Sequence, residues 1–103
     1  QNLHAGLLDF QELSEAKKAY EAKEYESASK IYNDYAKKST HQESYYNAGN
    51  ALYKENKFAK AIDSYKKASF EDNSKEANKF ANIGNAYVKE AKPKMLQKPK
   101  KTN

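Results

Sequence analysis

Apolar residues recur every three or four positions through most of the chain, which is the spacing of one face of an α-helix. Polar breaks interrupt this pattern at residues 23–24, 56–57 and 71–74, and no stretch alternates apolar with polar residues as a half-buried strand does. The sequence therefore predicts an all-α domain of five helices. Their expected ranges are residues 3–22, 25–38, 40–55, 58–70 and 75–92.

Local signals support several of these boundaries. Thr40 and Glu43 have the spacing of a capping box, so we expect the third helix to begin there. The polar residues 71–74 offer N-cap candidates for the fifth helix. That helix is expected to stop before Pro93, because proline disfavours helical backbone in the residue that precedes it.

Two segments of the chain resemble each other. Residues 47–57 (NAGNALYKENK) match residues 82–92 (NIGNAYVKEAK) at seven of eleven positions, with a spacing of 35. Aromatic residues and alanine recur at a spacing of 33: Tyr20, Tyr25, Ala28 and Tyr32 align with Tyr53, Phe58, Ala61 and Tyr65. A period near 34 is typical of helix-turn-helix repeats.

The central repeat resembles the tetratricopeptide repeat (TPR) family. The family pattern of bulky, small and aromatic residues is matched by Tyr45, Gly49, Leu52, Phe58, Ala61, Tyr65 and Ala68. The resemblance implies a helix-turn-helix solenoid of about two and a half repeats within residues 1–92. The repeats would cover residues 9–41, 42–74 and, as a partial unit, 75–92. Small residues at Gly49 and Ala61 would let the paired helices approach closely.

The turns depart from the family pattern. Where the family favours glycine between paired helices, this chain has Lys23 and Asn56. Asparagine tolerates left-handed backbone, whereas lysine adopts it at a cost. We therefore expect the first turn to be irregular.

The resemblance implies a function in binding rather than catalysis. Family members hold an extended peptide in a concave groove lined by the first helix of each repeat, which predicts a non-enzymatic protein–protein interaction scaffold. Asparagine offers both a donor and an acceptor to a peptide backbone. The alternative is that the groove is vacant or filled by the chain's own tail. The predicted groove residues are Lys17, Tyr20, Asn47, Asn50, Lys54, Asn82, Asn85 and Lys89.

The third repeat has no second helix to pack against Gly84. Phe80, Ile83, Tyr87 and Val88 are therefore expected to leave an apolar face partly exposed. Two interpretations stay open. The chain is a domain excised from a longer repeat array, or it is an assembly unit that forms a homodimer through Phe80, Ile83 and Tyr87.

A second resemblance rests on the lysine-rich composition, the small number of repeats and the final NIGNAYVKE segment. These look like the TPR part of bacterial Bat (aerotolerance-operon) proteins, some of which carry a membrane-anchored von Willebrand A domain. This resemblance implies an envelope location and a scaffold role. The composition itself fits a cytoplasmic or a periplasmic protein equally well.

The positive charge is concentrated at the C-terminal end. Residues 1–88 carry 13 Lys and 13 acidic residues, whereas residues 89–103 carry six Lys and one Glu, which accounts for the net charge of +5. Residues 93–103 are predicted to be a disordered basic tail that is solvated, contacts acidic lipid or nucleic acid, or serves as a linker. All 19 basic residues are Lys, and the absence of Arg argues against a dedicated nucleic-acid partner.

Other chemistry is not expected. The chain has no Cys, and its two histidines, His4 and His41, have no companions at metal-ligand spacing, so neither a metal nor another cofactor is predicted. No phosphate-binding loop or catalytic triad is present. No run approaches the roughly 18 apolar residues of a membrane span, so direct membrane insertion is not expected.

Overall fold

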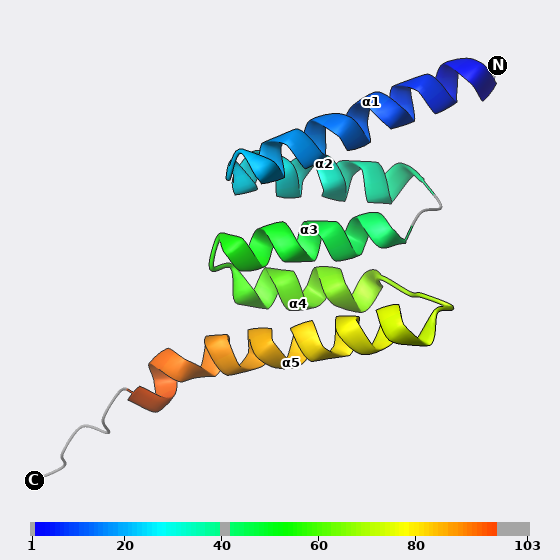
Figure 1. Cartoon of the computed structure of the whole chain (residues 1–103). Helices are drawn as coiled ribbons and strands as arrows, with labels where there is room; N and C mark the ends of the chain where they lie inside the picture. The colour runs from blue at the N-terminus through cyan, green and yellow to red at the C-terminus, as the bar shows by residue number, and fades with distance from the viewer. Residues whose placement is uncertain (1, 40–41, 97–103) are drawn as a thin grey trace, which may run out of the picture.

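The computed structural model describes the backbone of residues 2–39 and 42–96, and the side chains of residues 9–39 and 42–92. These residues form five α-helices and no strand, which confirms the predicted all-α class (Figure 1). The helices are α1 (Asn2–Glu21), α2 (Tyr25–Lys38), α3 (Glu43–Lys54), α4 (Phe58–Lys67) and α5 (Asn73–Leu96).

Consecutive helices lie side by side and antiparallel, so the chain forms one stack from α1 to α5 (Figure 1). α1 pairs with α2 and α3 pairs with α4, and α5 packs against α4. The fold is therefore a short helix-turn-helix repeat solenoid of about two and a half repeats, as the sequence predicts.

The same turn joins the helices of both complete pairs. Lys23 in the first turn and Asn56 in the second both have a φ of 64°. In each turn this residue donates its N–H to the carbonyl three residues back, and the next residue donates to the carbonyl five residues back, at 2.8–3.0 Å. This is the Schellman pattern that closes many helices. The expected irregularity of the first turn is wrong, because its hydrogen bonds hold Lys23 in left-handed backbone.

α3 begins later than predicted. Its N-cap residue is Gln42, which makes no side-chain capping bond, and Glu43 is the first helical residue. Glu43 therefore cannot occupy the third helical position that a capping box requires. Its carboxylate instead lies 3.2 Å from Lys75 Nζ at the start of α5. Thr40 lies outside the described residues.

α4 ends at Lys67, three residues before its predicted end. Ala68 is extended, with φ −79° and ψ 142°, and its carbonyl accepts a hydrogen bond from Lys79 Nζ at 2.9 Å. Glu76 accepts from Lys79 Nζ at 2.8 Å and from the backbone N–H of Phe70 at 3.1 Å. Side chains of α5 thus supply hydrogen-bond partners for backbone groups that follow α4. α4 therefore need not continue for these groups to be paired.

α5 begins at Asn73, where the side chain of Asp72 accepts a hydrogen bond from the N–H of Lys75 at 3.1 Å. This confirms that the polar residues 71–74 supply the cap.

The predicted end of this helix before Pro93 is wrong. α5 continues to Leu96, so residues 93–96 belong to a helix rather than to a disordered tail. Proline removes only one backbone donor, and Met95 and Leu96 favour helical backbone. The orange end of α5 bends away from the axis of its yellow part, as helices do at proline (Figure 1). The rest of the predicted tail, residues 97–103, lies outside the described residues.

Two hydrophobic clusters form the core. The first joins α1, α2 and α3 through buried alanines and Tyr32, and the second joins α3, α4 and α5 around Tyr65. The second cluster depends on Gly49, because a Cβ at this position would lie only 2.6 Å from two ring atoms of Tyr65 and would push the ring away. The predicted close approach of α3 and α4 at Gly49 and at the fully buried Ala61 is therefore confirmed.

Candidate functional site

Polar side chains recur along one side of α3 and one side of α5. On α3 they are Asn47, Asn50 and Lys54, and on α5 they are Asn82, Asn85 and Lys89. Intervals of three, four and seven residues place each set on one face of its helix. We call the surface between these two rows the α3–α5 groove.

A pocket of about 150 Å³ lies where both rows meet the end of α1. Side chains from four helices line it, and all three odd-numbered helices contribute. The lining residues are Tyr20, Asn50, Tyr53, Lys54, Tyr65, Asn82 and Asn85. The fold therefore brings five of the eight predicted groove residues around one pocket.

Hydrogen bonds to tyrosines orient two of the asparagines. The hydroxyl of Tyr65 donates to Oδ1 of Asn50 at 2.7 Å. Nδ2 of Asn82 donates to the hydroxyl of Tyr46 at 2.7 Å, which links α5 to α3. The first bond uses only the acceptor of Asn50, and the second uses one of two N–H groups of Asn82. Both side chains thus keep amide N–H groups with which to bind a ligand.

Tyr65 is protonated where it donates to Asn50. Burial raises the pKa of this phenol strongly, and neighbouring tyrosines raise it further. The hydroxyl therefore stays protonated at neutral pH and is able to donate. In the structure Asn50 presents its oxygen to this hydroxyl, and its amide nitrogen is left for the pocket.

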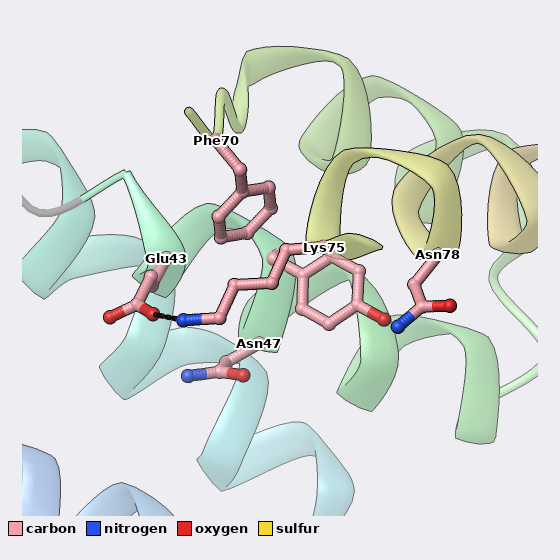
Figure 2. A pocket seen from close by; sticks show the side chains of 6 residues that line it. Glu43, Asn47, Phe70, Lys75 and Asn78 are labelled. Carbon is pink, nitrogen blue, oxygen red and sulfur yellow. Dashed lines mark hydrogen bonds and ion pairs between the residues drawn. The ribbon is translucent and has the colours of Figure 1, made fainter. Parts of the chain in front are cut away.

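A second pocket, of about 240 Å³, lies nearer the start of α3 and α5. Figure 2 shows Lys75 extending across it from α5 to Glu43, with Phe70 and Asn47 on either side. The ring of Phe70 packs edge-on against the ring of Tyr46, with 5.5 Å between centroids. Asn78 completes the lining. This pocket combines an aromatic wall with an exposed ion pair.

Three predicted groove residues lie apart from the first pocket. Asn47 lines the second pocket. Lys89 lines a shallow depression beside the turn between α3 and α4, together with Phe58. Lys17 is exposed on α1 and lines none of these three pockets. The structure thus separates the predicted set into a central group and three outlying positions.

The sequence analysis missed the tyrosines that line or brace the groove. Tyr53 and Tyr65 line the first pocket and Tyr46 lines the second. All three also pack in the second core cluster. The signal that could have found them is spacing, since Tyr46, Asn50 and Tyr53 follow one another on one helical face at intervals of four and three.

The size of these pockets limits what they can bind. Pockets for drug-sized molecules usually have volumes of about 300–1,000 Å³, whereas these have about 150 and 240 Å³. Each has room for one or two side chains of a ligand. Two such pockets along one surface suit an extended chain better than a compact small molecule.

The predicted dimer surface is only partly available. Phe80 and Tyr87 are 59% and 47% exposed, and Val88 is 64% exposed. Ile83 is buried, because it packs against Ile62 and Tyr65 in the second core cluster. The inclusion of Ile83 in an exposed face is therefore wrong.

No family model matches the chain, and no curated protein or solved structure is significantly similar to it. Among the described helices, none is long and apolar enough to cross a membrane. Within residues 9–39 and 42–92, His and acidic side chains do not gather in threes as a metal site would require. His41 and the side chain of His4 lie outside this part.

Proposed function

We propose that this chain is a protein-interaction module of the tetratricopeptide-repeat type, which binds an extended segment of a partner protein along the α3–α5 groove. The pocket that collects Tyr20, Asn50, Asn82 and Asn85 from three helices carries this proposal. Amide side chains pair with peptide N–H and C=O groups whatever the sequence of the peptide. Side chains of the partner would enter the two pockets.

The repetition within the structure supports assignment to a repeat protein of the tetratricopeptide type. Edge-on ring pairs recur at the two turns, between Tyr20 and Tyr25 and between Tyr53 and Phe58, each with 5.2 Å between centroids. The paired rings and the identical turns recur every 33 residues, close to the TPR period. Repeats that stack in this way bind their partners on the surface lined by equivalent helices.

The charge of the groove favours an acidic partner. Lys54 lines the central pocket and is exposed, and Lys17 and Lys89 are exposed on the flanking helices. The fourth cation, Lys75, is already paired with Glu43. A peptide that carries Asp or Glu beside its apolar residues would therefore associate faster and bind more tightly at low salt.

Selection from a phage-displayed random peptide library tests the proposal. Enriched peptides would be synthesised, and their affinity measured by fluorescence anisotropy. We expect Asn82→Ala combined with Asn85→Ala to weaken binding at least tenfold, since each lost hydrogen bond contributes about 1 kcal/mol.

Asn33→Ala is the matched control, because Asn33 lies in a depression lined mainly by α2 and α4. It should leave the affinity unchanged, and circular dichroism should show that every variant keeps its helices. If no peptide is enriched, or if the enriched peptides bind the double variant as tightly as the parent chain, the proposal is wrong.

A further inference from the structure

α5 presents a third face that lies outside the groove and outside its buried contact with α4. Ile83 and Ala86 face α4 and are buried, and Asn82 and Asn85 line the groove. The remaining face carries Phe80, Gly84, Tyr87 and Val88. We call these four residues the outer face of α5. Three of them are large and between 47% and 64% exposed, and a Cβ at Gly84 would meet nothing within 4 Å.

The equivalent face of α3 is the one against which α4 packs. Positions 35 residues earlier are occupied by Tyr45, Gly49, Leu52 and Tyr53, and residues of α4 lie against them. Tyr65 of α4 lies directly on Gly49.

Other contacts bind the same face of α3 to α4. The carbonyl of Tyr45 accepts a hydrogen bond from Ser64 at 2.8 Å. Leu52 and Tyr53 pack on the cluster formed by α4, and the ring of Phe58 lies edge-on against Tyr53.

The equivalence extends to the buried side of both helices. Ala48 and Ala51 of α3 pack in the first cluster with residues of α2. Their counterparts, Ile83 and Ala86 of α5, pack on α4 in the second cluster. α5 thus repeats both contact faces of α3, but only one of them is covered by a described part of the chain.

We propose that the outer face of α5 docks an amphipathic helix of a partner protein, in the antiparallel orientation in which α4 lies on α3. The partner helix would have an apolar stripe like that of α4, formed by Phe58, Ala61, Ile62 and Tyr65. An aromatic residue of the stripe would lie on Gly84, where the lack of a side chain leaves room for a ring. This surface is separate from the groove, so the inference goes beyond the proposed function.

Charge at the edge of the outer face adds a further requirement for the partner. Lys66 Nζ lies 5.7 Å from the ring centroid of Tyr87, and Lys92 is exposed near the end of α5. None of the ion pairs in the described part of the chain includes either lysine. Acidic residues beside the apolar stripe of the partner helix would therefore be favoured.

A second copy of this chain is a poorer occupant. The helix with the required stripe is α4, and in each copy α4 already lies between α3 and α5. Ile62 and Tyr65 are 3% and 1% exposed. A second copy would have to unfold its own repeat to offer that helix.

The test uses as the model amphipathic helix a peptide with the apolar stripe of residues 56–70 in which the four lysines are replaced by glutamate (NEFAEAIDSYEEASF), so that it carries the acidic residues that the edge of the outer face favours. The ¹⁵N-labelled chain is titrated with this peptide and followed by NMR. We expect the largest shifts at Phe80, Gly84, Tyr87 and Val88. Gly84→Leu should weaken binding at least tenfold while the chain keeps its fold, since a Cβ at this position meets no atom within 4 Å and the side chain extends from open surface.

Two matched controls accompany the titration. A peptide whose tyrosine is replaced by alanine should bind at least tenfold more weakly, because it lacks the ring that would lie on Gly84. The chain variant Asn85→Ala should bind the peptide as the parent does, because Asn85 lies in the groove. Failure of groove binding would leave this result untouched, so the two proposals are tested separately.

Three outcomes would overturn the proposal. The first is a titration without shifts on the outer face. The second is a set of shifts centred on Asn50 and Asn82 instead. The third is a concentration-dependent dimer, seen by analytical ultracentrifugation and abolished by Gly84→Leu, which would assign the outer face to a second copy.

Discussion

Two glycines at equivalent positions of the repeat have opposite surroundings. Gly49 lies under the ring of Tyr65, and a Cβ there would be 2.6 Å from the ring, whereas Gly84 faces open space. Glycine costs a helix about 1 kcal/mol relative to alanine. At residue 49 the packing of Tyr65 against the glycine offsets this cost. At residue 84 no side chain of the described structure packs against the glycine, so nothing offsets it.

Alanine substitutions at the two glycines should therefore change stability in opposite directions. Gly49→Ala is expected to lower the free energy of unfolding by about 1–3 kcal/mol, because the methyl group forces Tyr65 out of place. Gly84→Ala should raise the free energy of unfolding by up to about 1 kcal/mol. Urea denaturation measures both, and changes of the same sign would contradict the assignment of the two environments.

The turn between α1 and α2 and the turn between α3 and α4 have the same backbone conformation, although their sequences differ. Lys23 and Asn56 have the same φ, although lysine is poorly suited to left-handed backbone and asparagine tolerates it. The surrounding hydrogen bonds impose the conformation, and the lysine side chain contributes nothing that requires it there. The turn between α1 and α2 thus holds a local strain that the turn between α3 and α4 largely avoids.

Glycine in the first turn should relieve this strain. Lys23→Gly is expected to raise the free energy of unfolding by about 1 kcal/mol, since left-handed backbone costs an L-residue about 1–2 kcal/mol and glycine almost nothing. Asn56→Gly should have a smaller effect. Thermal unfolding followed by circular dichroism compares the two variants. A larger gain at residue 56 would show that the lysine is not the strained residue.

The loop between α4 and α5 depends on a carboxylate and should respond to acid. The hydrogen bond from Lys79 holds the pKa of Glu76 below its ordinary value of 4.5. Because the folded pKa is lower than the unfolded one, this contact contributes fully above about pH 4.5 and is lost as the pH falls through the folded pKa.

Glu76→Gln should therefore be less stable than the parent chain at pH 7, and the difference should shrink below pH 4.5. Urea unfolding at a series of pH values between 7 and 3 measures this. Glu71→Gln is the control, because Glu71 is exposed in the same loop. A stability difference for Glu76→Gln that stays constant with pH would contradict the role of the carboxylate.

For the molecule as a whole, periodicity and polar breaks predicted most of the fold. The range of α2 was predicted to the residue, since clear polar breaks flank an unbroken apolar stripe. The end of α4 was missed, because it depends on the bond from Lys79 to Ala68, a contact between helices that no local pattern indicates. The end of α5 was missed because a single proline was treated as a stop.

The geometry of the candidate site was predictable to the level of the helix face, but not of the individual contact. Helical spacing placed Asn50, Asn82 and Asn85 on the sides of their helices that line one pocket. Which asparagines are anchored depends on where the hydroxyls of Tyr46 and Tyr65 lie, and that position is set by packing among three helices. Ile83 shows the same limit, since a helical face alone does not tell whether a neighbour covers it.

The double role of Tyr65 constrains how this surface could change during evolution. Its ring fills the space above Gly49, and its hydroxyl holds Asn50. A substitution of Tyr65 would change the pocket and the core together, so selection for a stable fold would resist it. Lys54 and Asn85 are exposed on the same pocket. Under the proposed function, diversification toward new partners would therefore proceed at these two positions, while the tyrosine and the residues that it touches stay fixed.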